Sequence, residues 1–152
     1  MEFLETTVDK FTFRMPTDRL FSPEGIWFKP EAGENSNRWR IGLTDFLQQH
    51  SGDLTFAMLR PAGTRLVIGD EIGVIETIKV NVSLTSPAAG TIVTINPDLE
   101  MTPEVINQDP YGKGWLAVIE VASHDDLAAR LMKPAVYFEH MKSLAEAEVQ
   151  SR

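Results

Sequence analysis

Residues 61–68 read Pro-Ala-Gly-Thr-Arg-Leu-Val-Ile and residues 88–95 read Ala-Ala-Gly-Thr-Ile-Val-Thr-Ile, so the chain repeats a short segment after 27 residues. Each copy places Gly and Thr before β-branched residues, a composition typical of a turn that leads into a strand. Copies this short cannot fold as separate domains. They indicate a sandwich with quasi-twofold symmetry in which each half completes the other's core. The alternative is a chance match, because this turn-and-strand composition is common.

A single lysine lies between the two copies, in the stretch Glu76-Thr77-Ile78-Lys79-Val80. Lys79 is the only Lys or Arg from residue 66 to residue 111, a span that contains seven acidic residues. At the tip of a hairpin, such a lysine suits covalent attachment of a group that is carried between active sites. Acylation would remove its charge and add a long flexible arm. The alternative is an edge-strand lysine that discourages association between sheets, and spacing and composition leave both interpretations open.

Short runs of β-forming residues, separated by Pro and Gly, extend outward on both sides of this lysine. Their length and spacing predict a mainly β fold, either a sandwich or a flattened barrel. One short helix interrupts them, with Thr44 as its N-cap and Gly52 at its C-terminal end. The expected strands cover residues 11–15, 26–29, 39–43, 54–59, 65–68, 72–78, 80–84, 90–95 and 116–121.

The two ends of the chain differ from this central part. Residues 1–10 are expected to form a polar lead-in, whereas the segment after Val121 has a helical pattern. Ser123 followed by Asp126 resembles a capping box, and Pro134 suits the first turn of a second helix. That helix is expected either to dock a partner or to pack on the sheet. Its apolar stripe consists of Val136, Phe138, Met141, Leu144 and Ala145.

Composition excludes several classes of function. The 152 residues include no Cys, which rules out a thiolate metal site, and the three His residues are too scattered for a metal cluster. A formal charge of −8, from 22 acidic and 14 basic residues, disfavours binding to nucleic acid. No nucleophile–base pair or phosphate-binding loop indicates an enzyme. No apolar stretch is long enough to span a membrane and no signal-peptide core is present, which predicts a cytoplasmic protein.

Four motifs around Lys79 follow the pattern of one known family. The family's Gly-Ile-Thr-Asp-Tyr-Ala-Gln corresponds to Gly-Leu-Thr-Asp-Phe-Leu-Gln at residues 42–48, and its lipoylation motif Glu-Ser-Val-Lys to residues 76–79. Its Ser-Pro-x-x-Gly follows at residues 86–90. Its Pro-Glu-Leu-Val-Asn-x-Asp-Pro-Tyr-Gly-x-Gly-Trp is nearly complete at residues 103–115. In this order the motifs resemble the H protein of the glycine cleavage system, a lipoyl-bearing carrier, over residues 21–120.

The resemblance implies a lipoyl-type fold. This is a flattened β-barrel or sandwich, a barrel-sandwich hybrid, with short peripheral helices and a C-terminal helix. It also implies three parts of the chain. Residues 1–20 would be an N-terminal extension, residues 21–121 the lipoyl-carrier domain, and residues 122–152 a C-terminal helical segment that packs on the domain.

The resemblance also implies the chemistry of the hairpin. Lys79 would carry lipoic acid as a covalent lipoyl-lysine, and it would be an anchor for the group and not a catalyst. Glu76 and Thr77 would be read by a lipoate ligase or lipoyl transferase, in a recognition hairpin completed by Ile78 and Val80. A biotin carrier would have Met beside the lysine, and neither neighbour is Met. No catalytic residue and no metal ligand is expected.

Three departures from the family's pattern bear on the pathway. The family's His-x-Trp reads Gly25-Ile26-Trp27, its Val-Glu-Leu-Pro reads Ala-Met-Leu-Arg at residues 57–60, and the N-terminus is extended. Such divergence fits the H-protein-like lipoate-binding proteins of a heterodisulfide-reductase-like system for sulfur oxidation, in which the arm would carry sulfur. The prediction leans slightly to that pathway. The alternative is the glycine cleavage H protein itself, which carries an aminomethyl group.

Both pathways imply similar partners for a carrier that is not an enzyme. They are the attaching ligase, dihydrolipoamide dehydrogenase, and either the heterodisulfide-reductase-like complex or the glycine cleavage enzymes. The acidic surface would steer the carrier to basic docking sites on these partners. The chain is expected to act as a monomer, without nucleic acid or membrane. An alternative of a different class is a β-sandwich interaction module in which Lys79 is never modified.

Overall fold

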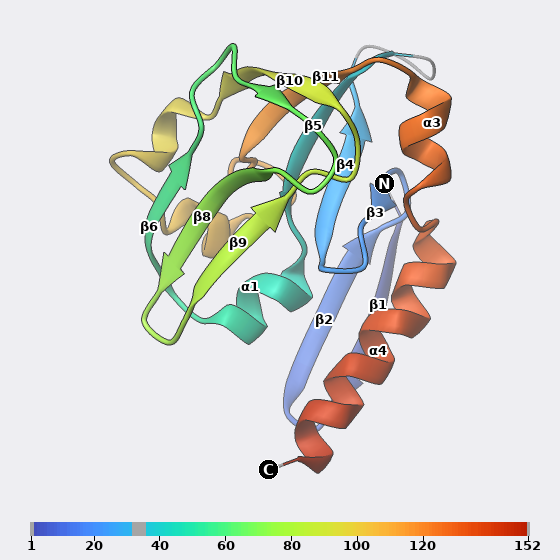
Figure 1. The fold of residues 1–152 in the computed structure, drawn as a ribbon. Coiled ribbons are helices and arrows are strands. Elements are labelled where there is room, and N and C mark those ends of the chain that lie inside the picture. The colour runs from blue at the N-terminus through green and yellow to red at the C-terminus, as the bar shows by residue number, and fades with distance from the viewer. Residues whose placement is uncertain (1, 32–35, 152) are drawn as a thin grey trace.

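Two facing β-sheets form the centre of the computed structural model, which describes residues 2–31 and 36–151 (Figure 1). The larger sheet has six strands in the order β3-β4-β5-β11-β10-β7, and the smaller has three in the order β6-β8-β9. All neighbouring strands in both sheets are antiparallel. Buried side chains from both sheets form one apolar core. The expected mainly β fold with a C-terminal helix is confirmed.

Most elements are short, and only α3 and α4 follow the last strand along the chain. The strands are β1 (Phe3–Val8), β2 (Phe11–Pro16), β3 (Leu20–Phe21), β4 (Ile26–Pro30), β5 (Arg38–Leu43), β6 (Leu54–Leu59), β7 (Arg65–Leu66), β8 (Glu71–Thr77), β9 (Asn81–Thr85), β10 (Gly90–Ile95) and β11 (Ala117–Val121). The helices are α1 (Asp45–Ser51), the 3₁₀ helix η1 (Pro97–Leu99), α2 (Val105–Gln108), α3 (His124–Ala129) and α4 (Pro134–Gln150).

The two copies of the repeated segment pair with each other. β7 runs antiparallel to β10, with Arg65 opposite Thr91. In the repeat, Arg65 corresponds to Ile92 and Thr91 corresponds to Thr64, each 27 residues away. The Ile92 amide donates to the Thr64 carbonyl at 2.9 Å, so the corresponding pair is also bonded. The ladder between the two copies therefore continues from the Arg65–Thr91 pair to Thr64 and Ile92.

β7 is shorter than the sequence predicts. It ends at Leu66, and Val67 and Ile68 are exposed in a turn. The carboxylate of Asp70 accepts a hydrogen bond from the Val67 amide at 2.9 Å, and Gly69 has a φ of 89°, in the region that favours glycine. The hydrogen bond and the glycine of this turn thus outweigh the strand propensity of Val67 and Ile68.

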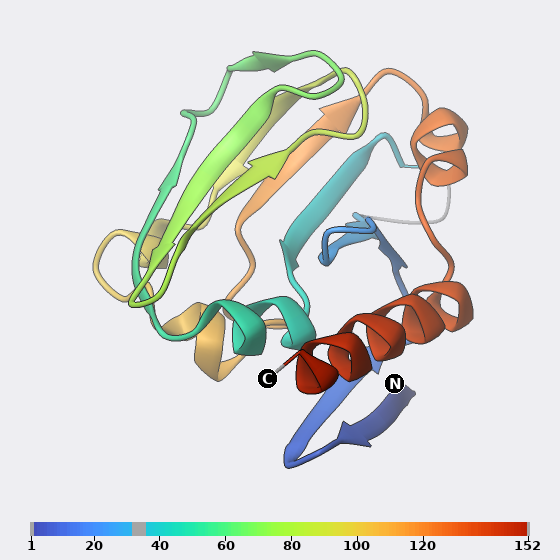
Figure 2. The ribbon, with the colours of Figure 1, turned by 60° about the horizontal axis from the view of Figure 1, so that its bottom comes forward.

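The prediction of a polar lead-in at residues 1–10 is wrong. β1 pairs with β2 along its whole length in a separate two-stranded sheet, and the turn between them contains Asp9 with a φ of 57°. Figure 2 shows α4 lying across this hairpin. Apolar side chains of the hairpin, β3, β4, α1 and α4 form a second core, which consists of Val8, Phe13, Met15, Phe21, Trp27, Phe46, Tyr137, Met141 and Ala145. This core includes side chains from both ends of the chain.

The buried face of α4 also differs from the expected stripe. Tyr137, Met141 and Ala145 are buried at a spacing of four residues, whereas Val136 and Leu144 are exposed. Tyr137 stacks on Phe21 with ring centroids 4.8 Å apart. Because a helix buries only one face, the aromatic contact at Tyr137 decides which stripe turns inward.

The helix boundaries follow the predicted caps. The Thr44 hydroxyl accepts from the Leu47 amide at 3.2 Å, and Gly52 ends α1 with a φ of 91°. The Ser123 hydroxyl accepts from the Asp126 amide at 3.2 Å, and Pro134 stands in the first turn of α4. Among the described residues, no helix is both long and apolar enough to cross a membrane.

Candidate functional site

Lys79 lies in the tight turn that joins β8 to β9, at one end of the smaller sheet (Figure 1). The last pair of the hairpin ladder is Glu76 with Asn81. The Lys79 side chain is exposed and forms no ion pair with any residue in the described ranges. Its amine is therefore accessible to an acylating enzyme.

The hydroxyl group of Thr77 organises this turn. It accepts hydrogen bonds from the amides of Lys79 at 3.2 Å and Val80 at 3.0 Å. It donates to the Ser51 carbonyl at 2.7 Å, so the turn is tied to the end of α1. The Thr77 amide also donates to the Val80 carbonyl at 2.9 Å. One side chain thus fixes both the shape of the turn and its attachment to the rest of the molecule.

The end of α1 forms a seat for the hairpin. The Ile78 amide donates to the Asp53 carbonyl at 3.1 Å. At Gly52 a side chain would reach within 3.4 Å of the aliphatic stem of Lys79, so that stem lies along bare backbone. The positive φ of Gly52 also favours glycine at this position. The seat supports the stem and leaves the amine free.

Asn107, from α2, holds the seat in place. Its amide nitrogen donates to the Gln48 side chain at 3.0 Å and to the Gly52 carbonyl at 3.3 Å. Its oxygen accepts from the Leu54 amide at 2.8 Å. Sequence reasoning identified Asn107 only as part of a motif. Its place in a motif without a regular strand pattern is the signal that could have pointed to a structural role for its side chain.

The structure brings the five predicted hairpin residues together. Thr77 is partly buried, and Glu76, Ile78, Lys79 and Val80 are exposed. Ile78 is 69% exposed and Val80 is 49% exposed, so two branched apolar side chains flank the lysine on the surface. Exposed apolar side chains beside an accessible amine are a surface that another protein can recognise.

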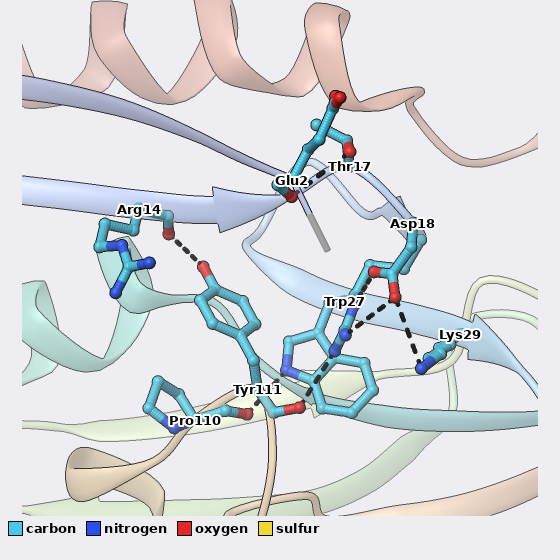
Figure 3. A network of polar contacts seen from close by, with 9 residues as sticks. Glu2, Arg14, Thr17, Asp18, Trp27, Lys29, Pro110 and Tyr111 are labelled. Atoms are coloured by element: carbon cyan, nitrogen blue, oxygen red, sulfur yellow. Dashed lines mark hydrogen bonds and ion pairs between the residues drawn. The ribbon is translucent and has the colours of Figure 1, made fainter.

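The segment that contains Asp109, Pro110 and Tyr111 is held by a polar network (Figure 3). The Trp27 indole donates to the Pro110 carbonyl at 2.9 Å. The Tyr111 hydroxyl donates to the Arg14 carbonyl and accepts from the Asp45 amide, which is the first residue of α1. Burial raises the pKa of Tyr111 above its usual range, so this hydroxyl stays protonated and keeps its donor role. The network is structural and fixes the start of the helix whose end seats Lys79.

The buried guanidinium of Arg19 completes this network. It donates to the Tyr111 carbonyl at 3.2 Å and lies over the Trp27 ring, 4.6 Å from its centroid. Asp18 pairs with Arg19 at 2.8 Å and with Lys29 at 3.4 Å. Figure 3 shows the contact between Asp18 and Lys29. Burial raises the pKa of Asp18, but hydrogen bonding and the positive charges of these two partners outweigh it, and the net shift is downward.

The side chain of Lys79 also borders an apolar pocket at one end of the second core. The pocket is lined by Val8, Phe11, Phe13, Phe46, Gln49, His50, Lys79, Ala145, Glu148 and Val149. His50 pairs with Glu148 at 2.8 Å, which joins the end of α1 to the end of α4. Within residues 2–31 and 36–151, no three His, Asp or Glu side chains converge as metal ligands.

The described hairpin fits a covalently attached acyl group. The amine is exposed and unpaired, the stem rests against Gly52, and the turn is held by Thr77 without any contribution from the amine. Acylation of the amine would therefore break no hydrogen bond or ion pair of the described residues. The geometry offers an anchor and no catalytic constellation around it.

Comparison with known proteins identifies the family. Residues 20–144 match the family model described as "Glycine cleavage H-protein". The glycine cleavage system H protein of Salinibacter ruber is 40% identical over 124 residues, which cover 82% of this chain and 96% of that protein. That of Oceanobacillus iheyensis is 41% identical over 113 residues, 74% of this chain and 86% of that protein.

A solved structure has the same fold. The crystal structure of a glycine cleavage system H protein from Mycobacterium marinum superposes with a TM-score of 0.71 at 30% sequence identity. The match covers 81% of this chain and 95% of that one. Proteins of this family carry lipoic acid attached covalently to a lysine, and they are carriers and not enzymes. The chain therefore belongs to the glycine cleavage H-protein family and is a lipoyl carrier.

Proposed function

We propose that the chain is the H protein of a glycine cleavage system and carries an aminomethyl group on a lipoyl arm at Lys79. The observation that carries this proposal is the unpaired amine at the tip of a rigid hairpin in a member of this family. The names of the similar proteins support the pathway, since those from Salinibacter ruber and Oceanobacillus iheyensis are both glycine cleavage system H proteins.

The comparisons do not support the leaning to sulfur oxidation that the departures in the sequence suggested. One departure has a reason in packing. Gly25 stands where the resemblance places His, and its φ is 103°. A side chain there would meet Leu47 at 3.0 Å, Thr44 at 3.1 Å and the Tyr137 hydroxyl at 3.3 Å. The packing of α1 and α4 around Gly25 thus accounts for the missing His.

Each residue of the hairpin has a distinct role in this proposal. The Lys79 amine forms an amide with an activated lipoyl group and loses its charge. Thr77 holds the turn in one shape, and Glu76, Ile78 and Val80 present the surface that a lipoate ligase or lipoyl transferase reads. The lipoyl dithiolane supplies the reversible chemistry, because it opens to a dithiol that accepts and releases a group.

The partners follow from this role. They are the attaching ligase, the enzymes that load and unload the aminomethyl group, and dihydrolipoamide dehydrogenase, which restores the disulfide. The acidic chain, with a formal charge of −8, supports docking on basic surfaces of these enzymes. Residues 21–121 would form the carrier domain, with the segments before and after it as additions that pack together.

Intact mass measurement tests the attachment site. After incubation with lipoate ligase, ATP and lipoic acid, the wild-type protein should gain the mass of one lipoyl group, and Lys79→Arg should gain none. Lys113→Arg, a change at another surface lysine, is the matched control and should be modified fully. Modification of Lys79→Arg, or none of the wild type, would refute the carrier site and favour an unmodified interaction module.

A loading assay tests the pathway. The lipoylated protein is mixed with glycine and the pyridoxal-phosphate-dependent glycine decarboxylase of a glycine cleavage system. Release of carbon dioxide that depends on the lipoylated protein is the expected result. Full lipoylation without any such release would contradict the glycine assignment and restore the sulfur-oxidation alternative.

A further inference from the structure

We propose that the free edge of β6, with the hollow beside it, docks an extended segment of a partner enzyme that has an apolar centre and basic flanks. The inference rests on the proposed function in one respect, because the partner is taken to be an enzyme that works on the arm of Lys79. The surface itself can be tested without that function.

β6 is an edge strand of the smaller sheet. Among the strands of the described residues, it pairs with β8 alone. An edge strand has backbone amides and carbonyls that point outward, and an extended segment can bond to them as an added strand. No proline lies within Leu54–Leu59, so every residue of the strand has an amide donor, of which that of Leu54 is already bonded to Asn107.

The side chains along this edge are apolar. Phe56 is 41% exposed and Met58 is 61% exposed. Between β6 and η1 there is a hollow of about 440 Å³, within the range of pockets that bind ligands. It is lined by Phe56, Ala57, Met58, Leu59, Ile95, Asn96, Pro97, Leu99 and Glu100. Exposed apolar side chains around a hollow of this size mark an interaction surface.

The charges around the hollow select the kind of segment that fits. Glu100 lines the hollow, Asp98 lies on η1 and Asp53 directly precedes β6. All three are exposed, and none forms an ion pair with another described residue. Arg60 is the only base among residues 53–60 and 95–104. A second copy of the chain would bring like charges together, which is unfavourable. A segment with lysine or arginine beside its apolar centre complements the surface.

The position of β6 suits an enzyme that acts on the arm. Phe56 lies opposite Glu76, and Met58 lies opposite Val74, on the strand that leads to Lys79. Val74 lies three residues before Thr77, the last residue of β8, which is about 10 Å at the rise of a strand, and Lys79 follows in the turn. A partner bound along β6 is therefore held beside the hairpin without covering Lys79.

A peptide titration tests the surface directly. The ¹⁵N-labelled protein is titrated with an eight-residue peptide that has a Val-Thr-Val-Thr core and two lysines at each end. A second peptide has the same core and glutamates at the ends. The lysine peptide should shift the amide resonances of β6 saturably, bind at least tenfold more tightly than the glutamate peptide, and weaken with salt. Unshifted β6 resonances, or equal binding of both peptides, would overturn the proposal.

A kinetic experiment tests the role in catalysis by the partner. Met58→Glu in the lipoylated protein should raise the KM of the loading enzyme at least tenfold and leave its kcat nearly unchanged. Ile68→Glu alters a side chain that is 56% exposed on the turn between β7 and β8 and does not line the hollow, so it should leave KM unchanged. Circular dichroism and the extent of lipoylation check that both variants fold. If both variants load like the wild type, the surface does not dock this enzyme.

The two proposals fail in different ways. If the wild type is lipoylated but never loaded by glycine cleavage enzymes, the proposed pathway is wrong, and the peptide titration still decides the fate of the β6 surface. If loading proceeds normally in Met58→Glu and the lysine peptide does not bind, the pathway stands and the docking surface is refuted.

Discussion

The Thr77 hydroxyl does more for the hairpin than its place in a recognition motif suggests. It accepts hydrogen bonds from two amides of the turn and donates one to the Ser51 carbonyl. Thr77→Val keeps the shape of the side chain and removes all three hydrogen bonds. Each contributes about 0.5–1.5 kcal/mol. We expect the rate of lipoylation at low carrier concentration to fall about tenfold, because the ligase then meets a turn that samples many shapes.

Thr77→Ser is the matched variant, since it keeps the hydroxyl. It should restore lipoylation nearly to the wild-type rate. Hydrogen exchange of the Lys79 and Val80 amides supplies a second measurement, which should accelerate in the valine variant only. Equal lipoylation rates in all three proteins would show that the hydroxyl does not position the lysine.

Asp18 makes stability depend on pH in a predictable direction. Its pKa is lowered in the folded protein, because the hydrogen bond and charge of Arg19 and the charge of Lys29 outweigh the opposing effect of burial. A lowered folded pKa stabilises the fold above the unfolded value of about 3.9, and that contribution is lost as the pH falls through the folded pKa. Asp18→Asn should lower the free energy of unfolding by about 1–2 kcal/mol at pH 7.

Urea denaturation at several pH values measures this effect. The difference between Asp18→Asn and the wild type should shrink below about pH 4. Glu5→Gln is the control, because Glu5 pairs with Arg14 at 3.6 Å with both side chains more than half exposed. Its effect should stay below about 0.5 kcal/mol. A difference for Asp18→Asn that is constant down to pH 2 would contradict the argument.

Helix α1 connects the two cores to the hairpin. Its N-cap, Thr44, accepts from the Leu47 amide at 3.2 Å and shares a hydrogen bond of 3.1 Å with the buried hydroxyl of Tyr137. Its other end seats Lys79 through Ser51 and Gly52. Any change that frays this helix should therefore reach both the C-terminal helix and the turn.

Thr44→Ala should lower the free energy of unfolding by about 1–2 kcal/mol, because it removes an N-cap and leaves the Tyr137 hydroxyl without its partner. Thermal or chemical denaturation measures the loss. Thr44→Ser keeps the oxygen and should lose less than about 0.5 kcal/mol. Equal stability of the alanine and serine variants would exclude capping as the cause.

Two apolar cores stabilise the whole protein, and they are built from different parts of the chain. The first lies between the sheets and belongs to the middle of the chain. The second joins the β1–β2 hairpin, α1 and α4, so it closes the two ends of the chain onto each other. The hairpin that carries Lys79 belongs to the smaller sheet, and the second core reaches it through α1 and the pocket beside Lys79.

Met141→Ala tests how far the cores are coupled. Met141 is 1% exposed in the second core, and its truncation should cost about 2–5 kcal/mol of stability. We expect α4 and the β1–β2 hairpin to become sensitive to protease, while lipoylation of Lys79 continues at the wild-type rate. Val136→Ala, on the exposed face of α4, is the control and should change neither. Loss of lipoylation in Met141→Ala, with the protein still folded, would show that the second core controls the hairpin.

Local signals in the sequence were sufficient for part of this picture. Runs of β-branched residues and Pro–Gly punctuation predicted most strands, and Thr44, Gly52 and Ser123 marked helix ends correctly. These features act over a few residues, so neighbours along the chain contain the necessary information. Lys79 was recognisable because it is the only base in a long acidic span and because it lies in a recognisable motif. The turn at its position agrees with the predicted hairpin tip.

Long-range contacts decided the rest. The packing of the β1–β2 hairpin against α4 and the inward face of α4 depend on partners far away in the chain, so propensity and periodicity could not resolve them. The same holds for the seat of Lys79, which Ser51, Gly52 and Asn107 build from two separate segments. The local sequence thus identifies Lys79 as the proposed attachment residue. The seat beneath Lys79 forms only when distant segments pack, because its stability depends on burial and on hydrogen bonds between those segments.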